Sequence, residues 1–215
     1  MFAEIAPTYD RANRLLSLRV DVLWRRKALR DLLPSPGRVL DLASGTGDLA
    51  IELERMGHDA VSADFTLEML LAGRKKVSPR GIHQISADAL ALPFATDSFD
   101  ALTVAFGIRN FADPYEALRE MKRVVRHGGR LMILELSNPS GLLAGPYSWY
   151  FGTILPRLGG LISGSRYAYR YLPSSVGDFP QGERFLELMR SAGWRSCTAS
   201  KLSGGIATIY RGESE

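Results

Sequence analysis

The sequence predicts a doubly wound α/β fold, and three observations lead to this prediction. Short apolar runs alternate with helix-like segments between residues 38 and 137, so successive strands need crossover connections. A glycine-rich turn follows the first apolar run. Two further runs near the C-terminal end are joined by residues 202–205 alone, a link that permits only a hairpin. We therefore expect a seven-stranded, mostly parallel sheet with an antiparallel last strand, in one domain over residues 1–215.

Each expected strand is an apolar run bounded by turn residues, and each expected helix is a longer segment with apolar residues at helical spacing. Strands are expected at residues 38–43, 59–64, 82–88, 99–106, 129–137, 195–201 and 206–211. Helices are expected at residues 48–56, 67–76, 114–126 and 182–192. The first strand follows residues 34–37, whose prolines and glycine would end a preceding helix.

Two segments lie outside this alternation. Residues 1–34 carry leucine and valine at amphipathic spacing and predict an N-terminal helical segment. The basic residues around Arg25 form either a solvated helix face or a membrane-surface patch. Residues 140–180 are rich in glycine, proline and tyrosine and are too long for a passive loop, so we expect an insertion that acts as a substrate lid. Core helix packing is the alternative for its apolar residues.

The composition excludes several classes of protein. Hydrophobic residues make up 46% and charged residues 23% of the chain, close to ordinary globular usage. No run is apolar enough to span a membrane and no signal-peptide pattern is found, so we expect a cytoplasmic protein. The single cysteine excludes an internal disulfide. The three histidines share no metal-ligand spacing, so we expect each at the surface and no bound metal.

The stretch VLDLASGTGDLA, residues 39–50, matches the G-x-G-x-x-G/A pattern of dinucleotide-binding turns through Gly45, Gly47 and Ala50. Such a turn before a helix suits either a pyrophosphate or a carboxylate. Asp41 argues against the pyrophosphate, because its carboxylate would repel phosphate groups a few ångströms away. A cationic ligand would instead be attracted.

Asp41, Asp64 and Asp88 stand at the ends of three successive expected strands, which meet at one edge of a parallel sheet. S-adenosyl-L-methionine (SAM) matches all three: its ammonium and sulfonium suit Asp41, its ribose diol suits Asp64, and its adenine suits Asp88 with the N–H of Ala89. We therefore predict SAM as the cofactor. Each aspartate could instead cap the helix that follows it. An NAD(P)-dependent oxidoreductase is the rival interpretation of the loop.

Motifs along the whole chain add a second argument. They are FxxIAPTYDxxNxxLSxxxDxxW at residues 2–24, LDLxxGTGD at 40–48, ALPF at 91–94, DxxTxxFGxRN at 100–110, ALREMxRV at 117–124, GGRL at 128–131, LELS at 134–137, YRYLPSS at 169–175 and GGI at 204–206. With them the chain resembles the class I SAM-dependent methyltransferases and, among these, the C-methyltransferases of ubiquinone and menaquinone biosynthesis. The glycine loop is generic, whereas FGIRN and YRYL are specific to that family. The chain departs from the family pattern at residues 125–129, at Ala105 and at Ser44.

This resemblance implies transfer of a methyl group from SAM to a ring carbon of a demethylated, prenylated quinol. Arg109 would stabilise the phenolate, because arginine does not normally act as a base near neutral pH, and Asn110 would orient a water or the ring hydroxyl. A structural ion pair is the alternative for Arg109. The cofactor-binding residues are expected to be Asp41, Gly45, Thr46, Gly47, Asp64, Phe65, Met69, Asp88, Ala89 and Ala105. The expected substrate contacts are Tyr9, Tyr169 and Arg170.

The lipid tail of such a substrate leads us to expect peripheral attachment at the inner face of the membrane, through the lid and the basic helix. The net charge of +4 is a small excess, so we expect no nucleic-acid partner. The sequence leaves open whether the chain forms a homodimer and whether the ring is a naphthoquinol or a benzoquinol. Besides the NAD(P)-dependent oxidoreductase, two further rivals remain: a SAM-dependent methyltransferase of another small phenolic or lipid substrate, and a non-catalytic membrane- or nucleic-acid-binding module.

Overall fold

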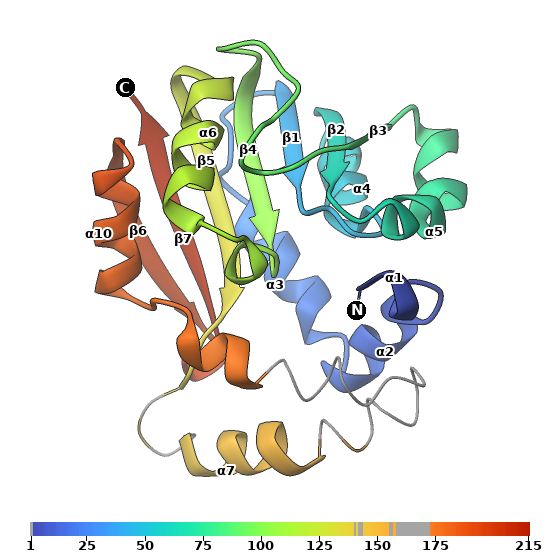
Figure 1. The fold of residues 1–215 in the computed structure, drawn as a ribbon, viewed down its shortest axis with the longest axis vertical. Coiled ribbons are helices and arrows are strands. Elements are labelled where there is room, and N and C mark those ends of the chain that lie inside the picture. The colour runs from blue at the N-terminus through green and yellow to red at the C-terminus, as the bar shows by residue number, and fades with distance from the viewer. Residues whose placement is uncertain (1, 140, 142–143, 155–156, 158–172) are drawn as a thin grey trace.

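The computed structural model describes residues 2–139, 141, 144–154, 157 and 173–215, with a seven-stranded sheet at its centre (Figure 1). The strands are β1 Arg38–Leu42, β2 Asp59–Asp64, β3 His83–Ser86, β4 Phe99–Ala105, β5 Val125–Leu136, β6 Trp194–Leu202 and β7 Ala207–Ser214. They lie in the order β3-β2-β1-β4-β5-β7-β6. Strands β1 to β5 pair in parallel, whereas β7 is antiparallel to β5 and to β6. The predicted parallel sheet and its final hairpin are confirmed.

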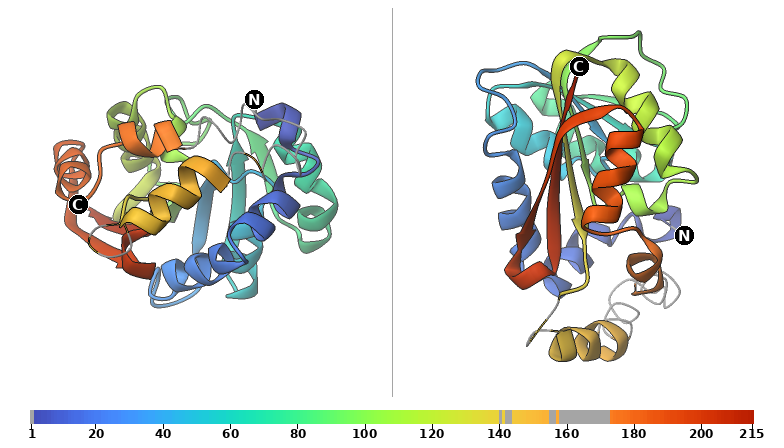
Figure 2. Two further views of the ribbon diagram at one scale, coloured as in Figure 1. Left: turned by 90° about the horizontal axis from the view of Figure 1, so that it is seen from below. Right: turned by 90° about the vertical axis from the view of Figure 1, so that its left-hand side faces the viewer.

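Helices cover both faces of this sheet, as the edge-on view in Figure 2 shows. They are α1 Phe2–Ile5, α2 Tyr9–Leu16, α3 Val20–Leu29, α4 Asp48–Arg55, α5 Leu67–Val77, α6 Pro114–Val124, α7 Ala144–Trp149 and α10 Glu183–Ser191, with short turns η1 Ser78–Arg80, η2 Ile108–Asn110, η4 Tyr150–Ile154 and η5 Ser203–Gly205. One core cluster includes residues of α6 and α10, and a second includes residues of α3 and α4. Along β5, Leu131 and Ile133 belong to the first cluster and Met132 and Leu134 to the second, as strand alternation requires.

The carboxyl ends of the parallel strands meet at one edge of the sheet. Helices α1, α2 and α7 lie beyond this edge (Figure 1). The described ends of the 140–180 segment pack there against the N-terminal helices: Phe151 and Val176 share a small core cluster with Ile5 and Ala12. The hydroxyl of Tyr150 also donates to the backbone carbonyl of Leu16 at 2.8 Å. The loops at this edge are therefore enclosed by segments from distant parts of the sequence.

The passage from α6 into β5 differs from the expected one. The helix ends at Val124 and the strand begins at Val125, which pairs with Phe99. The pairing then shifts between Phe99 and Ala101, and Gly128 has a φ of 73°, a value that favours glycine. Residues 125–129, expected as a helix end and a surface turn, are thus an irregular start of β5.

The N-terminal segment consists of the helices α1, α2 and α3 and is not one continuous amphipathic helix. Between α2 and α3, Leu18 and Arg19 have φ values of 50° and 63°, so the chain turns there. Leu15, Leu18 and Leu23 are 59%, 80% and 63% exposed. A part of the leucine pattern from which the helical segment was predicted therefore faces solvent.

Two residues expected at the surface are buried. The Arg25 guanidinium forms an ion pair with Asp21, and both side chains are enclosed. His58 is also buried, and its Nδ1 accepts a hydrogen bond from the Gly37 N–H at 3.2 Å. Burial lowers the pKa of His58. The surface assignment of His58 was wrong because this histidine closes the turn that leads into β1.

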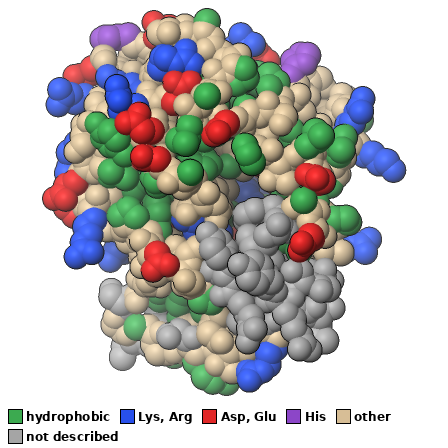
Figure 3. All heavy atoms as spheres, viewed as in Figure 1, with side chains coloured by type: hydrophobic (Ala, Val, Ile, Leu, Met, Phe, Trp, Pro, Cys, Tyr) green, Lys and Arg blue, Asp and Glu red, His purple; other side chains and the backbone are tan. Residues whose placement is uncertain are grey.

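Three further findings concern the surface, the helices and the titratable side chains of the described residues. On the face shown in Figure 3, acidic and basic side chains are interspersed, in line with the small net charge. In the part of the chain that the structure describes, no helix is both long and apolar enough to cross a membrane. Nor do the described residues gather three or more His, Cys, Asp or Glu side chains in a group that could hold a metal ion.

Candidate functional site

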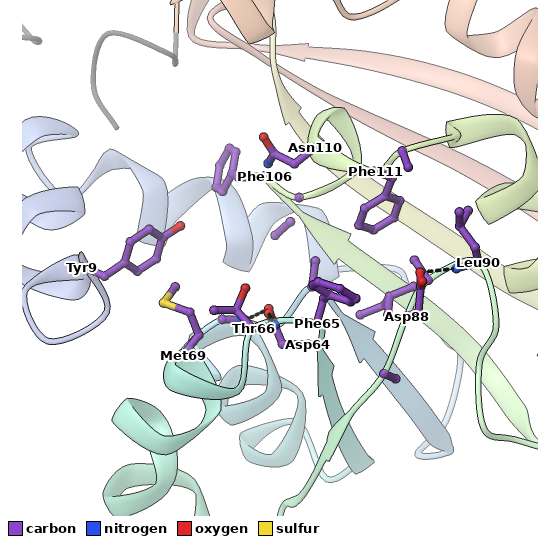
Figure 4. Close-up of a pocket in the computed structure, with 18 residues that line it drawn as sticks. Tyr9, Asp64, Phe65, Thr66, Met69, Asp88, Leu90, Phe106, Asn110 and Phe111 are labelled. Atoms are coloured by element: carbon purple, nitrogen blue, oxygen red, sulfur yellow. Dashed lines mark hydrogen bonds between the residues drawn. The ribbon is translucent and has the colours of Figure 1, made fainter. Parts of the chain in front are cut away.

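A cavity of about 310 Å³ opens at the carboxyl edge of the sheet, at the ends of β1, β2, β3 and β4 (Figure 4). It is lined by Tyr9, Leu42, Ala43, Gly45, Asp64, Phe65, Thr66, Met69, Ala87, Asp88, Ala89, Leu90, Ala105, Phe106, Gly107, Asn110, Phe111 and Ala112. Most of these groups are apolar, and two carboxylates lie among them. A mostly apolar hollow with a few polar groups is typical of a small-molecule site.

The glycine loop after β1 brings bare backbone to this cavity. Gly45 has a φ of 56°, and a Cβ placed there would stand 3.3 Å from Met69 Cε and 4.0 Å from Tyr9 Cε1. Gly47 has a φ of 85°, and a Cβ there would collide with Val77 Cγ1 at 2.5 Å. Gly45 therefore leaves space open to a ligand, whereas Gly47 lets α5 pack closely against the loop.

Asp64, at the end of β2, is held by backbone groups on both sides. Its Oδ2 accepts from the Gly45 N–H at 2.7 Å and its Oδ1 from the Thr66 N–H at 2.8 Å. Burial raises the pKa of Asp64, and these backbone bonds counteract it. Each carboxylate oxygen still has a second acceptor position. Asp64 thus both shapes the glycine loop and faces the cavity (Figure 4).

Asp88 follows β3 on the same side of the cavity. Its side chain is exposed, and its Oδ1 accepts from the Leu90 N–H at 2.9 Å (Figure 4). Ala89 lies beside it in the cavity lining, and Phe65, 75% exposed, lines the same side. The structure therefore brings together Gly45, Asp64, Phe65, Met69, Asp88, Ala89 and Ala105 from the predicted cofactor set.

Three members of that set lie outside the lining. Asp41 is 1% exposed; its Oδ1 accepts from the Thr103 hydroxyl at 3.2 Å, while its Oδ2 has no partner in the described structure. Burial raises the pKa of Asp41 to about 7. Thr46 donates through its hydroxyl to Asp10 at 2.6 Å, and Gly47 is the tightly packed loop residue. Thr46 and Gly47 therefore shape the glycine loop, whereas Asp41 is buried against β4.

The segment after β4 forms the opposite side of the cavity. A Cβ at Gly107 would collide with Ala43 Cβ at 2.4 Å, so this glycine lets the loops after β1 and β4 touch. Arg109 Nη1 donates to the Phe106 carbonyl at 2.7 Å and to Glu135 Oε1 at 2.5 Å. The Arg109 and Glu135 side chains are 7% and 1% exposed. The structural ion pair that the sequence left open for Arg109 is thus present, and its side chain is not in the cavity lining.

Of the other predicted site residues, some line the cavity and the others belong to the part of the chain that the structure does not describe. Asn110 and Tyr9 both line the cavity, on different sides of it (Figure 4). Burial raises the pKa of Tyr9. Tyr169 and Arg170 lie outside the described residues.

Sequence reasoning missed Glu135, which holds Arg109. Its local signal is an acid directly after the apolar residues 131–134. It also missed Phe106 and Phe111, whose place in a post-strand loop was the available signal.

The strand order, the glycine turn after β1 and the acids after β2 and β3 around one cavity define a class I SAM-dependent methyltransferase. Solved structures share the fold: a SAM-dependent methyltransferase from Thermotoga maritima aligns with a TM-score of 0.72 at 23% identity, covering 100% of this chain and 98% of that chain. The comparison at the level of sequence identifies the family.

The model of the ubiE/COQ5 methyltransferase family matches residues 1–214. Demethylmenaquinone methyltransferase from Thermus thermophilus is 49% identical over 99% of both chains. A ubiquinone/menaquinone biosynthesis C-methyltransferase from Geobacter sulfurreducens is 48% identical, over 99% of this chain and 86% of that relative. The chain belongs to the ubiE/COQ5 methyltransferase family.

Proposed function

We propose that this methyltransferase transfers a methyl group from SAM to a ring carbon of a demethylated, prenylated quinol. Its curated relatives are named for demethylmenaquinone and for ubiquinone and menaquinone biosynthesis, at 44–49% identity. The observation that carries the proposal is the cavity itself, which joins backbone-held carboxylates on one side to Phe106, Asn110 and Phe111 on the other. One side suits a nucleoside, and the other suits an aromatic ring.

The residues present fit SAM on structural grounds. The absence of a Cβ at Gly45 leaves a cradle between Met69 and Tyr9. Asp64 would accept the ribose hydroxyls at its remaining acceptor positions. Phe65 would lie against the adenine, whose edge would meet Asp88 and Ala89.

The other proposed cofactor residues act from different positions. Ala105 lines the cavity, whereas Thr46 and Gly47 shape the glycine loop. Asp41 would act on the cationic end of the ligand through its field, because a buried carboxylate is weakly screened.

Bound SAM supplies a methyl group that its sulfonium makes electrophilic. The protein must hold the accepting ring carbon in line with it and favour the phenolate over the phenol. An apolar pocket by itself would raise the pKa of the phenol. Arg109 offsets this effect with a charge behind the loop, and Asn110, in the cavity lining, orients the ring hydroxyl or a water.

The enclosing segments belong to the same proposal. In a single domain over residues 1–215, Tyr9 of the N-terminal helical segment 1–34 contacts the substrate, and the 140–180 insertion acts as its lid together with Tyr169 and Arg170. The packing of Phe151 and Val176 against the N-terminal helices supports this arrangement.

Peripheral contact with the membrane completes the proposal. Leu18 at the α2–α3 turn is 80% exposed and Leu15 is 59% exposed, beside the exposed Arg11 and Arg19. Apolar side chains among basic ones suit an anionic lipid surface. The protein would then work at the inner face of the membrane from the cytoplasm. The oligomeric state is measured separately, by light scattering of the purified chain.

The test is a direct assay of purified protein with methyl-labelled SAM and either a demethylated naphthoquinol or a demethylated benzoquinol. We expect label on a ring carbon of at least one of them, located by mass spectrometry. Binding of NAD with no binding of SAM in calorimetry would overturn the cofactor assignment. Methylation of unrelated phenols with both quinols untouched would overturn the substrate.

A further inference from the structure

Four buried polar atoms without a hydrogen-bond partner gather behind the loop that follows β4. They are Arg109 Nε, Asn110 Oδ1, Glu135 Oε2 and Tyr147 Oη. Arg109 and Glu135 are bonded to each other through their other atoms, and Asn110 lines the cavity (Figure 4). Tyr147 packs in the same small cluster as Leu136, the neighbour of Glu135. Buried polar atoms are nearly always bonded, so this group needs an explanation.

The position of Glu135 in β5 makes its carboxylate unusual. Alternation along the strand places Glu135 after Leu131 and Ile133 on one face, and both of these residues belong to the apolar core. An apolar side chain there would avoid burying a charge. A buried ion pair is weak evidence for stability, because desolvation offsets the attraction between its partners. The Glu135–Arg109 pair is thus better explained by a ligand than by folding.

The unbonded atoms define which ligand would satisfy them. Glu135 Oε2 and Asn110 Oδ1 can only accept hydrogen bonds, whereas Arg109 Nε can only donate. Tyr147 also donates, because burial raises the pKa of its hydroxyl. A ring hydroxyl donates and accepts, and so can bond to both kinds of atom. A quinone carbonyl only accepts, and would leave the two acceptor atoms unbonded in a dry site.

We propose that Glu135, presented through its pair with Arg109, is the residue that makes this site bind the reduced, hydroxyl-bearing ring in preference to the oxidised quinone. This inference rests on the proposed quinol substrate. It assigns to Glu135 the discrimination between the reduced and the oxidised form of the ring. A site built to bond a substrate hydroxyl rejects the analogue that lacks it, because its own polar group stays unpaired. Glu135 Oε1 already accepts from the Leu136 N–H at 2.8 Å, which leaves Oε2 for the ligand.

The test compares the two redox forms of one probe, 2,3-dimethyl-1,4-naphthoquinone and its diol. Neither form has an unsubstituted carbon in the quinone ring for methylation. Affinities are measured anaerobically by calorimetry in the presence of adenosylhomocysteine. Wild-type protein should bind the diol roughly tenfold or more tightly than the quinone. Equal affinities in the wild-type protein would overturn the inference without any variant, and failure to bind either form would overturn the proposed function with it.

Glu135→Gln then assigns the preference to one residue. The amide adds a donor where the carboxylate had only acceptors, so the variant should lose the preference for the diol or reverse it. Glu120→Gln is the matched control, because Glu120 Oε1 likewise accepts from a backbone N–H, at 2.8 Å, and from an arginine, at 2.7 Å. Unlike Glu135, it also has a bonded second oxygen, since its Oε2 accepts from Arg123 Nε at 2.8 Å. Unchanged adenosylhomocysteine binding shows that each variant is folded. A preference retained in Glu135→Gln would overturn the role of Glu135.

Discussion

On the β2 side of the cavity both oxygens of Asp64 accept backbone N–H groups, whereas behind the opposite side, between β4 and β5, the Arg109–Glu135 pair leaves one atom of each partner unbonded. The β2 side is complete without a ligand, because main-chain geometry fixes its carboxylate. In our proposal the substrate completes the opposite side. On the proposed function, one cavity thus combines a preorganised half for a constant cofactor with an unsatisfied half that discriminates among substrates.

The largest expected effect comes from removing the charge on the unsatisfied side. Arg109→Ala should lower kcat by roughly 10²–10³-fold, the range for loss of one charge-stabilising group. It should also lower the free energy of unfolding by about 3–5 kcal/mol, because Glu135 is left buried without its partner. Adenosylhomocysteine affinity should stay within about threefold, since Arg109 does not line the cavity. Initial rates, denaturant unfolding and calorimetry measure the three quantities.

A double variant separates stability from chemistry. In Arg109→Met with Glu135→Leu, apolar side chains of similar volume replace the pair, and stability should recover while methylation stays lost. Recovery of both would show that the pair is structural, and unchanged turnover in Arg109→Ala would reject the role of Arg109 in stabilising the phenolate.

A substitution on the preorganised side should change the affinity for the cofactor. In Asp64→Asn the amide nitrogen cannot accept, so either the Gly45 N–H or the Thr66 N–H loses its partner. We expect the Kd for adenosylhomocysteine to rise about 10- to 100-fold, the effect of one or two charged hydrogen bonds. Asp59→Asn, at the exposed start of the same strand, is the control and should leave the Kd unchanged. Equal losses in the two variants would mean that Asp64 is not a ligand of the cofactor.

Asp41 should make the stability of the protein depend on pH near neutrality. Burial raises its pKa to about 7, above the ordinary value of 3.8. The native state therefore binds this proton more tightly than the unfolded chain does. The stability that Asp41 contributes is present at acidic pH and is lost as the pH rises to about 7. Asp41→Asn should remove this loss, as denaturant unfolding at a series of pH values would show.

The same titration should appear in cofactor binding. A cationic ligand favours the ionised Asp41, so SAM should bind more tightly as the pH rises through about 7. Asp41→Asn should weaken binding by about tenfold and remove the pH dependence, since about 1.4 kcal/mol of attraction is a modest value for a buried charge. If the affinity of the wild-type protein for SAM did not change with pH, Asp41 would not interact with the cationic end of the cofactor as proposed.

The fold could be predicted further than the site because its signals are local. Apolar alternation and turn residues located the strands, and the four-residue link required the final hairpin. The break at Leu18 and Arg19 was missed because a left-handed turn leaves no mark on leucine spacing.

In the site, strand alternation explains why Asp41 lies outside the cavity lining. Leu40 and Leu42 point to the face of α6 and α10, so Asp41 points to the other face. No local pattern could link Arg109 to Glu135, because they meet only through the pairing of β4 with β5.

The smallest expected effect concerns the side-chain contacts that hold the glycine loop on the preorganised side. Lys76 Nζ lies 2.7 Å from Asp10 Oδ2, 2.6 Å from Asp48 Oδ1 and 2.9 Å from the Thr46 hydroxyl, so it joins α2 to the glycine loop. Burial alone would raise the pKa of Asp48, but the Lys76 charge lowers it below its ordinary value. Asp48 therefore contributes stability above its unfolded pKa, and this stability is lost as the pH falls.

Lys76→Met should lower the free energy of unfolding by about 1 kcal/mol at neutral pH and make its decline toward acid shallower. The Kd for adenosylhomocysteine should rise about threefold, because α2 and the loop are no longer joined by this side chain. Lys75→Met is the matched control, since the neighbouring lysine is exposed and has no bonded partner in the described structure. If Lys76→Met left binding and the acid dependence as they are in Lys75→Met, the glycine loop would be rigid without its side-chain support. The backbone bonds of Asp64 would then suffice to hold the preorganised half of the cavity.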